Sequence, residues 1–105
     1  MTFVPLTRER HGHLSLNRFS NYAFARGHAL LPVTAAELPR AVLCLPIAFV
    51  EQGRSFLPVA VVGVQPGQSL YVTPDGRWAA PYVPAALRGH PFMLARSEDS
   101  FVLCI

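Results

Sequence analysis

The sequence predicts an α+β fold: a mostly antiparallel sheet of about five strands, two short helices and an extended N-terminal arm. Short apolar runs alternate with turn residues from residue 47 onward, a pattern typical of antiparallel strands. Residues 34–45 and 84–88 carry helix signals instead. Residues 1–33 show no sustained period, which predicts an arm packed on a core formed by residues 34–105. A length of 105 residues predicts a single domain.

Composition excludes several classes of protein. Hydrophobic residues make up 51% of the chain, which favours a packed core over intrinsic disorder. No apolar run approaches the roughly 20 residues that a membrane-spanning helix needs, and the N-terminus lacks the apolar segment of a secretory signal. We therefore expect a cytoplasmic protein. Cys44 and Cys104 lie in apolar surroundings and are expected to be buried thiols, although their spacing leaves a disulfide open.

The arm contains short apolar anchors that predict packing against the rest of the chain. Leu14–Leu16 alternates like a strand, but over a very short span. Residues 29–33 form a plausible short strand, which Pro32 restricts to an edge or an end of a sheet. The anchors are Phe3, Val4, Leu6, Leu14, Leu16, Phe19, Tyr22 and Phe24.

The first helix is predicted over residues 38–45. Its apolar residues recur at intervals of three and four, so they form one stripe. Thr34 and Glu37 have the spacing of a capping box, Pro39 suits the opening turns, and Pro46 ends the helix. The residues of the stripe are Leu38, Ala41, Val42 and Leu45.

The middle of the chain predicts a succession of strands and tight turns. Pro58 near the start of the second strand predicts regular pairing only from about Val59. Gln65–Gln68 fits a type II turn, because Gly67 supplies the positive φ at its second central position. A second tight turn is expected at Pro74–Gly76. The expected strands are residues 47–51, 56–64 and 69–73.

A short helix over Ala85–Arg88 and a terminal hairpin complete the prediction. The hairpin joins residues 92–95 to residues 101–105. Its last strand is apolar on both alternating faces, so both faces need covering. The arm or helix 38–45 supplies that cover, or a partner chain does. The candidate interface strand is Phe101, Val102, Leu103, Cys104 and Ile105.

An ordered series of short motifs over nearly the whole chain resembles the SapC family, a bacterial family named for its association with surface-layer (S-layer) protein genes. The motifs are Val4–His11, Phe24–Ala25, Pro46–Val50, Pro58–Gly63, Gly67–Leu70, Asp75–Trp78, Tyr82–Pro84 and Pro91–Phe92. Relatives continue beyond this length, so the resemblance implies an N-terminal portion. It also implies an accessory role linked to S-layer or cell-surface protein production, and it provides no catalytic signature.

The positive charge is concentrated in the first third of the chain. All nine basic residues are arginine, and residues 1–40 hold five of them against two glutamates. Arg8 and Arg10 are therefore candidate contacts for an acidic partner. The arginines are scattered and few aromatic residues lie between them, which argues against nucleic-acid binding.

Trp78, Tyr82 and Arg88 are candidates for a ligand or partner groove. Packing of the two aromatic residues under the helix is the simpler interpretation, because aromatic side chains dominate core burial. The groove supports an alternative function, a small-ligand-binding protein or an enzyme with a pocket near these three residues.

No catalytic residue, metal site or cofactor is predicted. His11 and His13, with His28, lack a cysteine or carboxylate at a familiar ligand spacing. Cys44 or Cys104 paired with a histidine has no flanking signature of a nucleophile. The favoured hypothesis is a non-enzymatic module that works through a protein partner or self-association.

Overall fold

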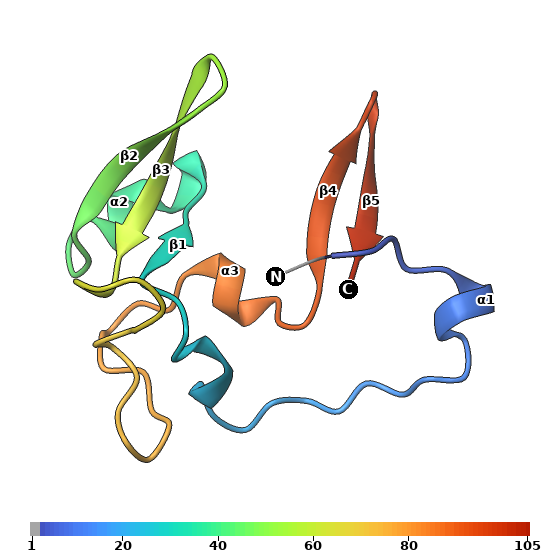
Figure 1. Cartoon of the computed structure of the whole chain (residues 1–105), viewed down its shortest axis with the longest axis horizontal. Helices are drawn as coiled ribbons and strands as arrows, with labels where there is room; N and C mark the ends of the chain where they lie inside the picture. The colour runs from blue at the N-terminus through green and yellow to red at the C-terminus, as the bar shows by residue number, and fades with distance from the viewer. Residues whose placement is uncertain (1–2) are drawn as a thin grey trace. The chain divides into compact units, whose positions relative to one another are not determined.

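The computed structural model describes residues 3–105, so residues 1–2 of the expected arm lie outside it. The described residues form five antiparallel strands in two sheets with a few short helices, which confirms the α+β class. The strands expected in one sheet divide into a three-stranded sheet and a separate hairpin. Two units contain them: residues 20–88, here the central unit, and the chain up to Phe19 together with Gly89–Ile105, here the hairpin unit (Figure 1). A single domain stays a prediction.

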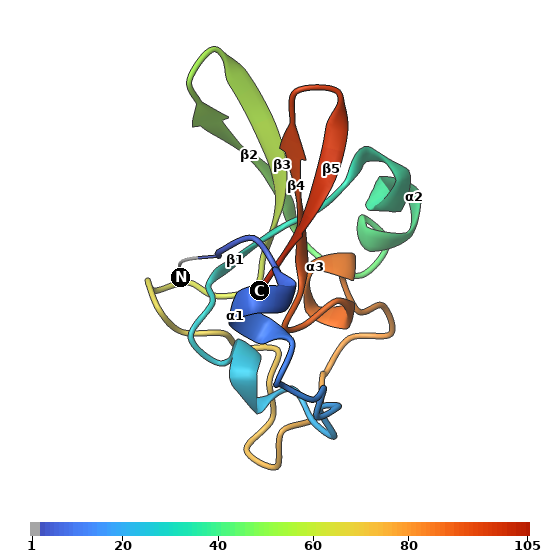
Figure 2. The same cartoon turned by 90° about the vertical axis from the view of Figure 1, so that its right-hand side faces the viewer.

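The sheet of the central unit has the order β1-β3-β2 (Figure 1), and Figure 2 shows the same strands turned by 90°. Its strands are β1 (Leu30–Pro32), β2 (Ile47–Gln52) and β3 (Ser55–Val61). β3 pairs with β2 from Ser55, so the expectation that Pro58 delays pairing is wrong on that side. It holds on the other side, where β1 pairs only with residues 59–61. Pro58 is accommodated because its missing N–H costs no bond to β1 there.

The two helices expected from the sequence lie in the central unit. A 3₁₀ turn, η2 (Ala35–Glu37), leads into α2 (Leu38–Ala41), and α3 is Ala85–Arg88 as expected. The helix predicted over 38–45 is therefore shorter than expected and continues only as turns. Leu45 is still buried, and its N–H donates to the carbonyl of Ala41 (2.8 Å). Pro46 and the immediate start of β2 leave no room for a further helical turn.

The core of the central unit lies between the sheet, η1 (Ala23–Ala25) and α3. It consists of Ala25, Leu31, Val33, Leu45, Ala60, Val62 and Leu87. The backbone of Gly63 lies very close to the backbone of Gln68, since a Cβ at residue 63 would come within 1.8 Å of the carbonyl oxygen of Gln68. Only glycine therefore fits between these two backbone segments.

The strand expected over residues 69–73 does not form. The N–H groups of Ser69, Leu70 and Thr73 donate to carbonyls in three different segments, so no continuous ladder develops. Only isolated bridges remain, among them Val72 with Trp78. The two expected turns beside this segment, Gln65–Gln68 and Pro74–Gly76, are present. Gly67 and Gly76 have the positive φ values that such turns need, 74° and 87°.

In the hairpin unit, β4 (Met93–Ser97) and β5 (Ser100–Cys104) pair directly as expected. Val4 and Leu6 run alongside β5: the N–H of Val4 donates to the carbonyl of Ile105 (3.0 Å), and that of Leu6 to the carbonyl of Leu103 (2.8 Å). Residues 4–6, here the N-terminal segment, thus lie along the edge of the hairpin at β5 and do not cover its face.

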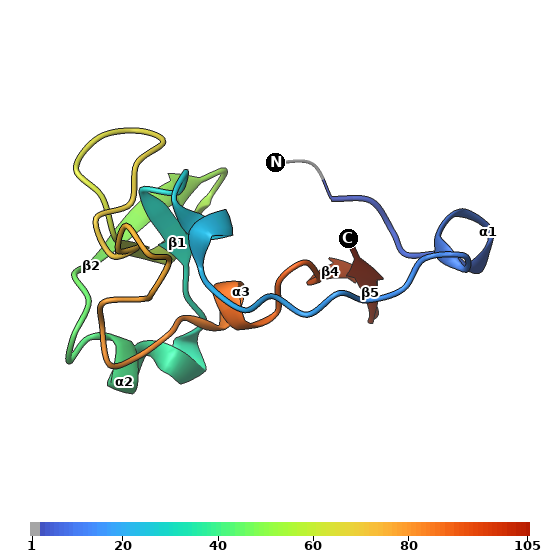
Figure 3. The ribbon, with the colours of Figure 1, turned by 90° about the horizontal axis from the view of Figure 1, so that it is seen from below.

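The expected arm contains more structure than its sequence indicated. A helical turn, α1 (Arg8–His11), begins after Thr7, whose hydroxyl accepts from the N–H of Arg10 (3.2 Å). After a turn at Gly12–His13, residues 14–19 follow an extended path without a strand at Leu14–Leu16 (Figure 3). Residues 20–33, the second part of the expected arm, belong to the central unit, where β1 joins the sheet.

Candidate functional site

Trp78, Tyr82 and Arg88 lie together in the central unit. The indole N–H of Trp78 donates to the carbonyl of Tyr82 (2.8 Å), and its ring stacks on Tyr71 with 5.5 Å between centroids. Nη2 of Arg88 donates to the hydroxyl of Tyr82 (3.3 Å), and its guanidinium lies 5.7 Å from the centroid of that ring. The polar groups of this cluster are thus bonded to one another within the unit.

Glu37 is the centre of this cluster, which the sequence indicated only in part. Its side chain is buried, with 7% exposed. Oε2 accepts from the N–H of Thr34 (2.7 Å), as the capping box predicts, and also from the hydroxyl of Thr34 (3.1 Å). Oε1 accepts from the hydroxyl of Tyr82 (2.8 Å) and from the N–H of Ala85 (2.7 Å), the first residue of α3. One carboxylate therefore joins η2 to α3.

The hydrogen bonds decide the charge state of Glu37. Burial acts to raise the pKa of its carboxyl, but the bonds from Ala85, Thr34 and Tyr82 together outweigh burial, and the pKa is lowered. Burial and the neighbouring Glu37 carboxylate raise the pKa of Tyr82. These contacts stabilise the unit's own fold. Ligand binding by Trp78, Tyr82 and Arg88 stays a prediction.

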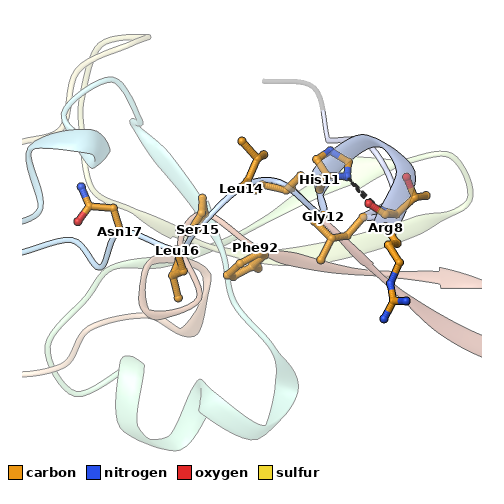
Figure 4. Close-up of a pocket in the computed structure, with 12 residues that line it drawn as sticks. Arg8, His11, Gly12, Leu14, Ser15, Leu16, Asn17 and Phe92 are labelled. Atoms are coloured by element: carbon orange, nitrogen blue, oxygen red, sulfur yellow. Dashed lines mark hydrogen bonds between the residues drawn. The ribbon is translucent and has the colours of Figure 1, made fainter.

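A second candidate region is a cavity within the hairpin unit, with a volume of about 630 Å³. Figure 4 places Arg8 and His11 on α1 at one end of the lining residues and Asn17 at the other. Its apolar lining consists of Leu6, Leu14, Leu16, Pro91, Phe92 and Ile105. Sequence reasoning missed the cavity, because the lining comes from both ends of the chain.

The two arginines predicted on the arm differ in position. Arg8 lines the cavity and Arg10 does not. Within residues 3–105, neither guanidinium forms an ion pair with a carboxylate. His11 is held in place by its Nδ1, which accepts from the N–H of Thr7 (3.0 Å). Arg8 is therefore a lining residue whose guanidinium has no ion-pair partner within residues 3–105.

The hairpin has one open edge. The carbonyls of Leu103 and Ile105 point toward the N-terminal segment, so alternation across the ladder directs the N–H and C=O groups of Leu94 and Arg96 away from β5. Among the described residues, no strand pairs with that side of β4. The backbone of residues 103–105 already pairs with Val4–Leu6, whereas β4 has no second partner strand among the described residues. Binding of a partner by residues 101–105 stays a prediction.

The side chains of the predicted interface strand are only partly covered. Leu103 lies opposite Leu94, so both share a face with Phe101, and the exposed fractions are 41%, 65% and 69% respectively. Val102 and Ile105 are half-buried, and Cys104 is buried on the other face as a free thiol. The apolar face formed by Leu94, Phe101 and Leu103 is here called the hairpin face.

No group of three or more histidine, cysteine or acidic side chains lies close enough to hold a metal ion within residues 3–105. No helix among these residues has the length and apolar character needed to cross a bilayer. His11 and His13 therefore do not belong to such a group.

Comparison with known proteins returns one result. The family model described as SapC matches residues 6–105, almost the whole sequence. Neither a curated protein nor a solved structure matches the chain.

Proposed function

Because the chain belongs to the SapC family, we propose that it is a non-enzymatic accessory module that binds a protein partner in the production of S-layer or other cell-surface proteins. The observation that supports binding is the open edge of β4 beside the exposed hairpin face. The link to surface proteins is the role that the family's name implies. Both cysteines are free thiols, in keeping with a cytoplasmic location.

Strand addition is the mode of binding that this geometry favours. A partner segment in extended conformation would pair with the outward N–H and C=O groups of Leu94 and Arg96. Its alternate side chains would cover the hairpin face, where Leu94, Phe101 and Leu103 lose contact with water. Natural sheets usually protect exposed edges with charges, bulges or a covering segment. On β4 the only such protection is one charged residue, Arg96. An acidic residue in the partner strand would complement that arginine.

Amide hydrogen exchange tests whether this edge is available. In a dilute sample the amides of Leu94 and Arg96 should exchange rapidly, while those of Met93 and Ala95, which face β5, stay protected. Binding should protect the first pair. Light scattering over a concentration series shows whether a second copy of the chain suffices as partner.

A fluorescent dye for apolar surfaces provides the matched comparison. Phe101→Ser should remove much of the dye signal, whereas Val64→Ser, at a residue in the central unit that is 83% exposed, should leave it. A strictly monomeric protein that binds no dye and has slow exchange at Leu94 would argue against the proposed function.

A further inference from the structure

The cavity of the hairpin unit has an apolar body with a cation at one end. Leu14 and Leu16 are more than half exposed, at 55% and 56%, although they line the cavity. Apolar side chains arranged around a hollow favour a ligand with its own apolar surface. The volume of about 630 Å³ lies within the range of small-molecule pockets, and the hollow is partly open to solvent.

The charge of the lining residues indicates the charge of the ligand. Among the described side chains that line the cavity, Arg8 is the only one that is always charged, and none is acidic. Its guanidinium forms no ion pair within residues 3–105. A guanidinium binds a carboxylate through two parallel hydrogen bonds, so an anionic group of that shape suits this end of the cavity.

The lining has few polar groups, which indicates that the part of the ligand beyond its anionic group is apolar. A peptide carries an N–H and a C=O at every residue, and each needs a partner when it is buried. The lining side chains with hydrogen-bonding groups other than Arg8 and His11 are Thr7, Ser15 and Asn17. A hydrocarbon chain makes no such demand and gains from every methylene that leaves water.

From these contacts we propose that the hairpin unit binds a long-chain fatty acid, with its alkyl chain along Leu6, Leu14, Leu16 and Phe92 and its carboxylate against Arg8. This is a small-molecule site separate from the open edge of β4. Binding would cover the two exposed leucines and neutralise the free guanidinium. It involves no covalent step.

Methyl NMR of the full chain with dodecanoate below its micelle concentration tests the site. The methyl groups of Leu14, Leu16 and Ile105 should shift with saturation, while those of Leu45 and Val62 in the central core stay unchanged. Dodecan-1-ol has the same chain without the charge and should bind about tenfold more weakly. Dodecyltrimethylammonium, with the opposite charge, should be weaker still.

Variants assign the charge contact. Arg8→Gln should weaken dodecanoate binding about tenfold and should remove the preference over dodecan-1-ol. Arg10→Gln, on the same helical turn but outside the lining, should change the affinity less than twofold. Leu14→Asp, at an exposed position that can accept a charge without unfolding, should weaken dodecanoate by more than tenfold.

Four results would overturn the proposal. They are the absence of saturable shifts, equal binding of dodecanoate and dodecan-1-ol to the unmodified chain, equal effects of Arg8→Gln and Arg10→Gln, and tighter binding at the same methyl groups by an apolar peptide with a free C-terminus. Failure here leaves the exchange test of the β4 edge unaffected, since that test reads the backbone amides of Leu94 and Arg96 and uses no lipid.

Discussion

Glu37 provides the sharpest test of what holds the central unit together. Replacing it by alanine removes the acceptor for the N–H groups of Thr34 and Ala85 and for the hydroxyl of Tyr82. A donor left without its partner costs about 1–3 kcal/mol, and loss of a helix cap about 1 kcal/mol. Because water can enter the space that the carboxylate leaves, the costs do not add in full, and we expect a loss of about 3–5 kcal/mol in the free energy of unfolding.

Urea unfolding followed by the fluorescence of Trp78 measures this loss. Trp78 is the only tryptophan, and it reports on the central unit, since its indole N–H is bonded to the carbonyl of Tyr82. Glu51→Ala is the matched control, because Glu51 is exposed on β2, and it should change stability by no more than about 0.5 kcal/mol. A loss below about 1 kcal/mol for Glu37→Ala, at an unchanged slope against urea, would refute the reasoning.

The remaining predictions use the same assay. The pKa of Glu37 is lower in the folded state than its ordinary value of 4.5, so the stability that the ionised carboxylate contributes is complete above that pH and is lost as the pH falls through the folded pKa. The difference in stability between the unmodified chain and Glu37→Gln should therefore be constant between pH 6 and 8 and should shrink below about pH 4.5. A difference that grows on acidification would contradict the lowered pKa. Tyr82→Phe removes one hydrogen bond to this carboxylate and should cost about 1–2 kcal/mol, whereas no change would mean that the bond contributes nothing. Gly63→Ala should cost at least about 2 kcal/mol of stability, because the new Cβ would overlap the carbonyl oxygen of Gln68. The control Gly27→Ala should be close to neutral, because its Cβ would meet no atom within 4 Å. Equal effects of the two variants would argue against the close approach at Gly63.

Local signals in the sequence predicted much of the fold. The short helix at Ala85–Arg88, the terminal hairpin and the turns at Gly67 and Gly76 follow from proline and glycine positions and from apolar alternation. The same rules failed for residues 69–73, which have strand-like composition. Their backbone groups find partners in several segments of the fold, and a local pattern does not contain that information.

The candidate sites show the same division. Arg8 was predicted from charge alone, but its place beside an apolar cavity depends on how residues 6–17 and residues 91–105 come together. Glu37 was recognised only as half of a capping box, because its other partners lie 45 and 48 residues away. In both cases the residue type was visible and its surroundings were not.

By itself the sequence determined the α+β class, the family and the positions of most turns, because propensity, periodicity and turn chemistry act over a few neighbouring residues. The tertiary structure alone decided that Val4 and Leu6 pair with β5, that β4 is the open edge, and that Glu37 joins η2 to α3. These features depend on which distant segments meet. That choice is made by burial and hydrogen bonding over the whole chain and leaves no periodic mark in the sequence.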